Sequence, residues 1–257
     1  MFLQRYAPAG SRTRGFHATG GTVIDFDGIR VHRFTWSNQF HVLRGSAEVE
    51  VFVLGPGERG GWRGGLGGQL IQESMHLSPG TYVVDIRNQP PPGQPGFGFS
   101  RFAHLEARHS PHPIGSSAHH VSGQNIEIWY EGGGSGPVAG GAAVGGGGGR
   151  GGHGADGTIL NLWGQQIRVG AGGGGGARRR FGPAGQTQLG GQGGAGGGGT
   201  GGAPLGPNGG NATGYGNGGG GAGGNLLGEP NQSVGVAGEG SIGFVVVRYP
   251  LELLEAA

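Results

Sequence analysis

Residues 172–176 read GGGGG and residues 216–221 read GNGGGG, and runs of this kind decide which fold the chain adopts. Glycine makes up 70 of the 257 residues. Counting along the sequence places 20 of them in residues 1–130 and 50 in residues 131–243. Glycine brings no side chain to bury and loses the most backbone entropy on ordering. Such a region therefore either stays disordered or folds by packing of its backbone.

Three structures compete for the glycine-rich region. Collagen is excluded, because it needs glycine at every third position and enriched proline, whereas runs such as 145–149 break that period and only 15 residues are proline. Disorder is the ordinary state of a glycine-rich tract. The third structure is a set of polyproline-II-like glycine helices, packed side by side so that their outward N–H and C=O groups pair with neighbouring helices.

Two segments favour order over disorder. Residues 158–169 interrupt the glycine with an apolar patch that includes Leu162 and Trp163. Residues 243–250 read GFVVVRYP, a β-branched strand that must find a partner in a sheet. We therefore expect the last strand to return to an earlier β layer, with packed glycine helices in between.

The first half of the chain is rich in strand signals. An Asp27-Gly28 pair predicts a tight hairpin between the first two strands, and alternation of valine with glutamate predicts a half-buried strand over residues 46–54. Residues 55–68 are expected to be a first glycine loop. The expected strands cover residues 22–26, 29–35, 39–43, 46–54, 81–86, 97–107, 125–130 and 243–250.

These observations predict an all-β fold, with an antiparallel sandwich-like β layer, packed polyglycine-II (PPII-like) helices and no substantial α-helix. Residues 1–19 are expected to be an N-terminal arm. A single domain follows over residues 20–250, β-rich over 20–130 and glycine-helical over 131–242, with the closing strand after it. Residues 251–257 are a tail that has room for one or two helical turns.

Composition excludes several classes of site. The chain has no cysteine, so disulfides, thiolate metal sites and cysteine nucleophiles are absent, and no cofactor is expected. All 17 basic residues are arginine, which excludes a P-loop lysine and a lysine Schiff base. No secretory signal follows the first residues, and the longest apolar runs are far too short to span a bilayer. No membrane insertion is expected.

The order of these motifs resembles a glycine-rich domain of bacteriophage tail proteins. The resemblance covers roughly residues 20–250, beginning with residues 22–35, 40–42, 49–54 and the PGTYVV of 79–84. The later landmarks are GADG at 154–157, the glycine run from 170, NATG at 211–214 and the strand from 243. In that family the domain sits at the end of minor tail proteins or tail fibres, and related adhesins display host-recognition loops on bundled glycine helices. Here the domain is nearly the whole chain, and the first glycine loop is interrupted by side chains.

Recognition residues are expected where side chains interrupt the glycine, because loops on a rigid scaffold commonly do the binding. An arginine run either contacts an anionic surface or is a solvated loop tip, and each other interruption is either a binding loop or a plain turn. The candidate receptor- or partner-binding residues are Arg178, Arg179, Arg180, Gln186, Gln188, Asn211, Tyr215 and Asn225. Those of the attachment arm are Arg5, Tyr6, Arg12 and Arg14.

Other chemistry has weak signals. His109, His112, His119 and His120 fall in one loop and are either weak candidate metal ligands or a solvated or partner-facing loop; no metal is expected. Arginine–glycine segments at 59–61, 63–65 and 150–152 resemble RNA-binding segments but are sparse, so nucleic-acid binding is not favoured. No nucleophile–base set and no paired carboxylates are visible, so no enzyme is expected.

The sequence therefore favours a non-catalytic bacteriophage virion protein of the tail tip or tail fibre that mediates host-surface adhesion. It would be made in the bacterial cytoplasm and assembled into the virion. Expected partners are other virion proteins through the arm, further copies in a homo-oligomer with a trimer favoured, and a glycan or protein of the host surface. The alternatives are a capsid decoration or head fibre protein, and a glycine-rich nucleic-acid-binding protein.

Overall fold

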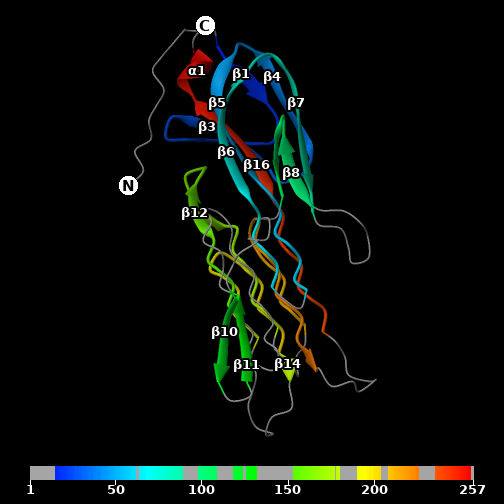
Figure 1. The fold of residues 1–257 in the computed structure, drawn as a ribbon. Helices are drawn as coiled ribbons and strands as arrows, with labels where there is room; N and C mark the ends of the chain where they lie inside the picture. Colours follow the sequence, from blue (N-terminus) through cyan, green and yellow to red (C-terminus); the bar gives the residue numbers. More distant parts are fainter. Residues whose placement is uncertain are drawn as a thin grey trace.

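A computed structural model describes residues 15–61, 64–88, 98–108, 118–123, 126–131, 153–176, 178–179, 190–203, 208–225 and 235–255. Two five-stranded antiparallel sheets face each other at one end of the molecule, and the glycine-rich segments run away from them (Figure 1). The expected all-β, sandwich-like fold is confirmed. The one helix in the described ranges is a single turn, α1 (Glu252–Glu255).

The sheets take their strands from distant parts of the chain. The first sheet has the order β1 (His17–Thr19), β4 (Asn38–Arg44), β7 (Gly80–Arg87), β8 (Phe99–Phe102), β9 (Leu105–Ala107). The second has the order β2 (Thr22–Phe26), β3 (Ile29–Phe34), β16 (Phe244–Pro250), β5 (Ala47–Leu54), β6 (Leu70–Leu77). The closing strand β16 thus lies in the middle of the second sheet. The sequence predicts that this strand returns to an earlier β layer, and it does so by pairing with β3 and β5.

Most strand predictions match the structure. The β2–β3 hairpin turns at Asp27 and Gly28, whose φ angles of 47° and 72° are those of a tight primed turn. Residues 97–107 were expected to form one strand, and this prediction is wrong: the chain turns at Ala103, with φ of 51°, to give the β8–β9 hairpin. β6 and β1 were not predicted, and residues 15–19 belong to the sandwich although the sequence suggests an arm there.

Six short strands in three pairs complete the β structure of the described residues. β10 (Ala118–Gly123) pairs with β11 (Ile126–Glu131), so part of the expected histidine loop is a strand. β12 (Thr158–Asn161) pairs with β13 (Gln166–Val169). β14 (Arg178–Arg179) lies parallel to β15 (Gly224–Asn225).

The main core fills the space between the two sheets. It includes Phe40, Val84 and Phe102 from the first sheet and Val51 and Val247 from the second, each at most 1% exposed. The rings of Phe40 and Phe102 meet edge to face with centroids 6.1 Å apart. This packing explains the alternation of buried and exposed residues along β4.

The apolar patch at 158–169 covers the other face of the second sheet. Leu162, Trp163 and Val169 form a second cluster with Phe244 and Val246 of β16. Because both of its faces are covered, six of the seven residues of β16 are buried. The patch therefore binds the glycine-rich part of the chain to the sandwich.

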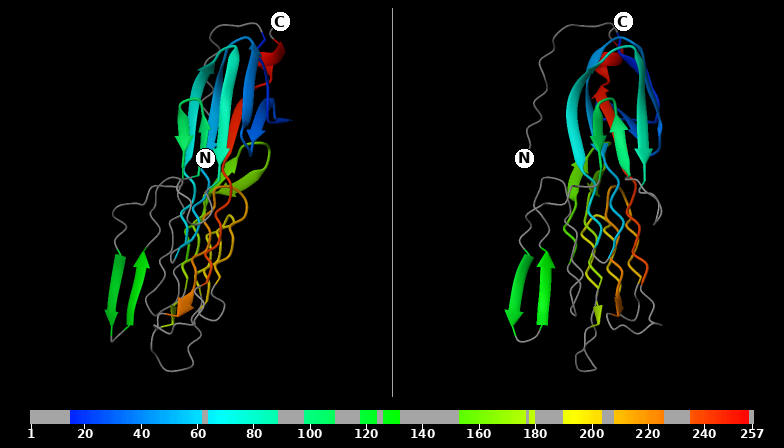
Figure 2. Two further views of the ribbon diagram at one scale, coloured as in Figure 1. Left: turned by 90° about the vertical axis from the view of Figure 1, so that its right-hand side faces the viewer. Right: turned by 45° about the vertical axis from the view of Figure 1, so that its right-hand side comes forward.

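The glycine-rich chain runs back and forth beside itself as a bundle (Figure 2). We call its members glycine segments, and together they make the glycine bundle. Backbone hydrogen bonds connect the described segments 55–61, 64–69, 153–157, 170–176, 190–195, 197–203, 208–213, 216–223 and 235–243. The expected first glycine loop is therefore two members of the bundle, although it lies in the β-rich half of the sequence.

Hydrogen bonds between glycine segments repeat every three residues. Gly218 and Gly221 donate to the carbonyl oxygens of Ala171 and Gly174, each at 2.8 Å. Gly219, the residue after Gly218, donates to a different segment, to the carbonyl oxygen of Glu58 at 2.9 Å. A polyproline-II-like helix has three residues per turn, so its successive N–H groups point in three directions. The three-residue spacing of these hydrogen bonds is the spacing expected of such a helix.

Segment 216–223 lies at the centre of the bundle and every one of its residues is buried. It exchanges backbone hydrogen bonds with six other segments. It donates to segments 55–61, 170–176, 208–213 and 235–243, and it accepts from segments 64–69, 197–203 and 235–243. A Cβ at Gly219 would overlap the carbonyl oxygen of Gly238, so this spacing excludes every other residue.

Both ends of the described chain lie at the pole of the sandwich opposite the glycine bundle (Figure 1). There the N–H of Phe16 donates to the carbonyl oxygen of Leu253 at 2.8 Å, which joins the start of β1 to α1. Phe16 is buried and Leu253 packs against the main core. No helix among the described ranges is long and apolar enough to cross a bilayer.

Candidate functional site

The far end of the glycine bundle brings together three of the predicted recognition residues. Arg178 pairs with Gly224, and Arg179 pairs with Asn225, in the parallel β14–β15 ladder. Figure 1 places this ladder at the end of the bundle farthest from the sandwich. Residues from two distant sequence segments therefore share one site there. Arg180, Gln186 and Gln188 lie outside the described residues.

Two other predicted recognition residues have contacts inside the molecule. Asn211 Oδ1 accepts a hydrogen bond from the N–H of Glu239 at 2.9 Å. The ring of Tyr215 is half-buried, with its centroid 5.5 Å from that of Phe244 and 6.4 Å from that of Trp163. Both side chains therefore hold parts of the scaffold together, and a receptor-binding role for either stays a prediction.

Asn217 is a central residue that the sequence did not single out. Its side chain accepts the N–H of Ala171 at 2.7 Å and donates to the carbonyl oxygens of Gly196, at 2.6 Å, and Thr213. Its own N–H meets Ser241 Oγ at 2.7 Å. The signal that could have identified it is a lone asparagine inside the run GNGGGG, where a buried amide must find several partners.

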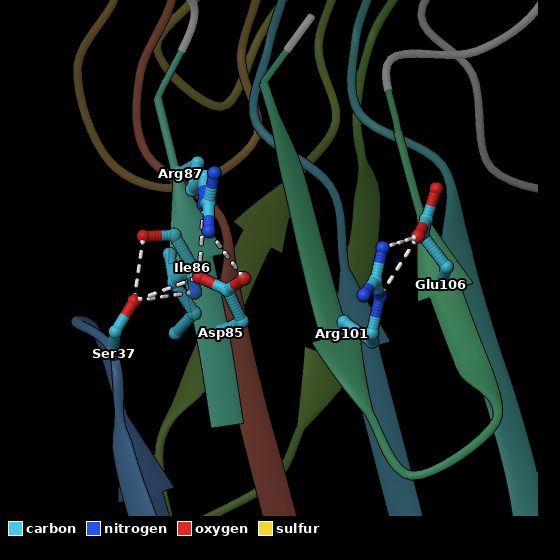
Figure 3. A network of polar contacts seen from close by, with 6 residues as sticks. All are labelled: Ser37, Asp85, Ile86, Arg87, Arg101 and Glu106. Carbon is cyan, nitrogen blue, oxygen red and sulfur yellow. Dashed lines mark hydrogen bonds and ion pairs between the residues drawn. The ribbon is translucent and has the colours of Figure 1, made fainter. Parts of the chain in front are cut away.

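A strip of alternating charges runs across the outer face of the first sheet (Figure 3). Ser37 Oγ lies 3.1 Å from Asp85 Oδ1, and Arg87 Nε donates to the same oxygen at 3.2 Å. On the next strands Arg101 Nε donates to Glu106 Oε2 at 2.8 Å. Hydrogen bonds from Arg101 and then Arg108 hold the pKa of the Glu106 carboxyl below its ordinary value.

The same face carries aromatic and apolar side chains. The guanidinium carbons of Arg87 and Arg101 lie 5.2 and 4.9 Å from the ring centroid of Phe99. Val83, two residues before Asp85 on β7, is 60% exposed. Exposed ion pairs of this type contribute about 0–1 kcal/mol each to stability. A face that mixes exposed apolar groups with paired charges is a second candidate surface for contact with another protein.

His32 and Tyr249 form a buried polar pair between β3 and β16. His32 Nδ1 lies 2.8 Å from the carbonyl oxygen of Gly20, and Nε2 lies 3.0 Å from the Tyr249 hydroxyl. Burial lowers the pKa of the His32 imidazole and raises the pKa of Tyr249 to about 12. With Nδ1 donating to Gly20, the neutral ring accepts from Tyr249. Both residues lie in the sheet interior, so the pair supports the fold.

The other predicted site residues add no cluster. His119 and His120 lie in β10, where their backbone pairs with Tyr130 and Trp129. Within the part of the chain that the structure describes, no group of three or more His, Asp or Glu side chains is placed to hold a metal ion. The remaining candidates, His109, His112, Arg5, Tyr6, Arg12 and Arg14, lie outside the described residues.

Comparison with known proteins gives no family for this chain. No protein-family model, no curated protein and no solved structure matches it.

Proposed function

We propose that the protein is a non-catalytic component of a bacteriophage virion, at the tail tip or in a tail fibre, that attaches the particle to the host surface. The sandwich pole would be the anchored end and the far end of the glycine bundle the recognition end. The partner at the recognition end would be a host glycan or protein. This proposal also rests on the resemblance to phage glycine-rich tail domains.

The observation that carries the proposal is the separation of the two poles. The start of β1 and α1 meet at the sandwich end, where Phe16 is hydrogen-bonded to Leu253. Arg178, Arg179 and Asn225 lie at the opposite end of the bundle. An attachment protein needs this polarity, since one end must join the particle while the other reaches the host.

Rigidity of the bundle supports the same role. Each N–H from Gly218 to Ala222 is bonded to a neighbouring segment, and each segment of the described bundle is bonded to at least one other. A rigid scaffold reduces the entropy that its recognition residues lose on binding. Arginines at its end fit a phosphate- or carboxylate-bearing surface, which guanidinium groups bind through paired N–H donors.

The direct experiment is an adsorption assay with purified full-length protein. Labelled protein should bind host cells saturably and should reduce adsorption of the phage. The double variant Arg178→Ala/Arg179→Ala should lose most of this binding, whereas Arg44→Ala, an exposed arginine of β4, should keep it. Normal adsorption of particles that lack the protein would exclude the adhesion role and favour a capsid decoration protein.

A further inference from the structure

We infer that two pairs of polar side chains close the outer edges of the glycine bundle and so prevent it from adding glycine segments of a second copy. One pair is Asn208 and Asn211 on segment 208–213. The other is His153 and Asp156 on segment 153–157. This inference concerns the assembly of the scaffold and does not depend on the proposed function.

The asparagine pair holds two successive turns of segment 235–243. Asn208 Oδ1 accepts the N–H of Val236, and Asn211 Oδ1 accepts the N–H of Glu239, both at 2.9 Å. The residue after each asparagine donates its own N–H to the carbonyl oxygen of the same partner residue, both at 2.8 Å. One neighbouring segment therefore occupies both the N–H and the C=O of Val236 and of Glu239.

The second pair repeats this geometry on segment 190–195. His153 Nδ1 accepts the N–H of Gln192 at 2.9 Å, and Asp156 Oδ1 accepts the N–H of Ala195 at 2.7 Å. Again the following residue donates to the carbonyl oxygen of the same partner, at 2.9 Å in both cases. In both pairs the acceptor side chains are three residues apart, which matches the three-residue turn of the segments.

The four acceptor side chains lie on the outside of the glycine bundle. The four acceptor residues and their four partners are all exposed, whereas segment 216–223 is wholly buried. In the interior, an N–H of this lattice donates to the carbonyl of a further glycine segment. An exposed N–H at the edge would offer the same bond to another chain, as the open edge of a β-sheet does. The side-chain oxygen or ring nitrogen occupies that position.

The test uses the full-length double variant Asn208→Gly/Asn211→Gly, which removes both acceptors and leaves a bare edge. Amide hydrogen exchange at Val236 and Glu239 should become about tenfold faster, since each N–H loses its bond. Exchange at Gly238, which donates to Gly220 at 2.8 Å, should not change. In sedimentation velocity the variant should form larger species with rising concentration than the unmodified protein does under the same conditions.

Matched controls make each outcome decisive. Gln192 takes part in the second pair through its backbone N–H, and Gln192→Gly removes only its exposed side chain. This variant should therefore alter neither the exchange rates nor the sedimentation. Asn208→Asp/Asn211→Asp keeps an acceptor oxygen and should keep slow exchange. The single variants Asn208→Gly and Asn211→Gly each remove the acceptor of one partner amide. They replace the double variant in the same two measurements if the double variant unfolds. Unchanged exchange overturns the inference, and so does faster exchange without self-association.

Discussion

Asn217 joins four parts of the glycine bundle through one buried amide. Replacing it by alanine removes the acceptor of the Ala171 N–H and the donors to Gly196 and Thr213. A buried polar group left without a partner costs about 1–3 kcal/mol. We expect Asn217→Ala to lower the free energy of unfolding by about 3 kcal/mol in urea denaturation. Asn38→Ala, at an exposed position, should change it by less than about 0.5 kcal/mol; equal effects of the two substitutions would contradict the role of Asn217.

The space around individual glycines gives a second prediction. A Cβ at Gly219 would overlap the carbonyl oxygen of Gly238, whereas a Cβ at Gly61 would meet no atom within 4 Å. Gly219→Ala should therefore destabilise the protein by about 3 kcal/mol or more, because the backbone must move apart. Gly61→Ala should be nearly neutral. Thermal unfolding of both variants measures the difference, and equal tolerance would show that segment 216–223 is not closely packed.

His32 gives the protein a pH-dependent stability. Burial lowers its pKa below the ordinary value of 6.5, so the unfolded chain binds a proton more readily than the folded one. The stabilisation that the neutral His32 side chain gives the folded protein is fully present above pH 6.5. It is lost as the pH falls toward the pKa of the folded state, by up to about 1.4 kcal/mol of unfolding free energy per pH unit. The slope of unfolding free energy against pH below 6.5 should decrease in His32→Gln. An identical slope in both proteins would exclude His32 as its source.

Among the elements, the β12–β13 hairpin joins the bundle to the sandwich through Trp163. The tryptophan ring meets the ring of Phe244 with centroids 5.9 Å apart, and the guanidinium of Arg33 lies 5.1 Å from its centroid. Trp163→Ala should cost about 3–5 kcal/mol of unfolding free energy. Ile159→Ala, in the same hairpin but 53% exposed, should cost far less. Urea denaturation compares the two, and similar losses would argue against Trp163 as the joining residue.

The elements differ in how far the sequence predicts them. The closing strand and the Asp27-Gly28 turn carry strong local signals, namely β-branched residues and a residue pair that tolerates positive φ. β6 does not, because its residues LIQESMHL place polar side chains at four of eight positions in an edge strand. β1 is three residues long, and Phe16, the residue before it, packs against Tyr249 of the distant strand β16.

The order of the glycine segments in the bundle, and most of the candidate site, cannot be predicted from the sequence. The sequence predicts backbone packing, but identical glycine runs do not say which segment lies beside which. A few side chains favour particular pairings: Asn217 bonds segment 170–176, and the edge pair Asn208 and Asn211 bonds segment 235–243. The proximity of Arg179 to Asn225 follows from that arrangement and is not visible in the chain.

At the scale of the whole molecule, a backbone-packed bundle extends a β-sandwich without a side-chain core of its own. The sandwich is stabilised by apolar burial, and Val245, Val246 and Val247 of β16 are all 0% exposed. The bundle is stabilised instead by hydrogen bonds that repeat in three directions around each inner segment. β16 and the β12–β13 hairpin connect the two, so the whole described structure is expected to unfold as one unit.

The described glycine segments form an ordered scaffold, and amide hydrogen exchange of residues 216–223 measures this order. Every residue of this segment is buried, and the N–H groups from Gly218 to Ala222 each donate to a neighbouring segment. We predict exchange within about tenfold of that of the buried amides of β16, because both should open only on global unfolding. Exchange at random-coil rates in residues 216–223, while β16 stays protected, would show that the glycine segments are not an ordered scaffold.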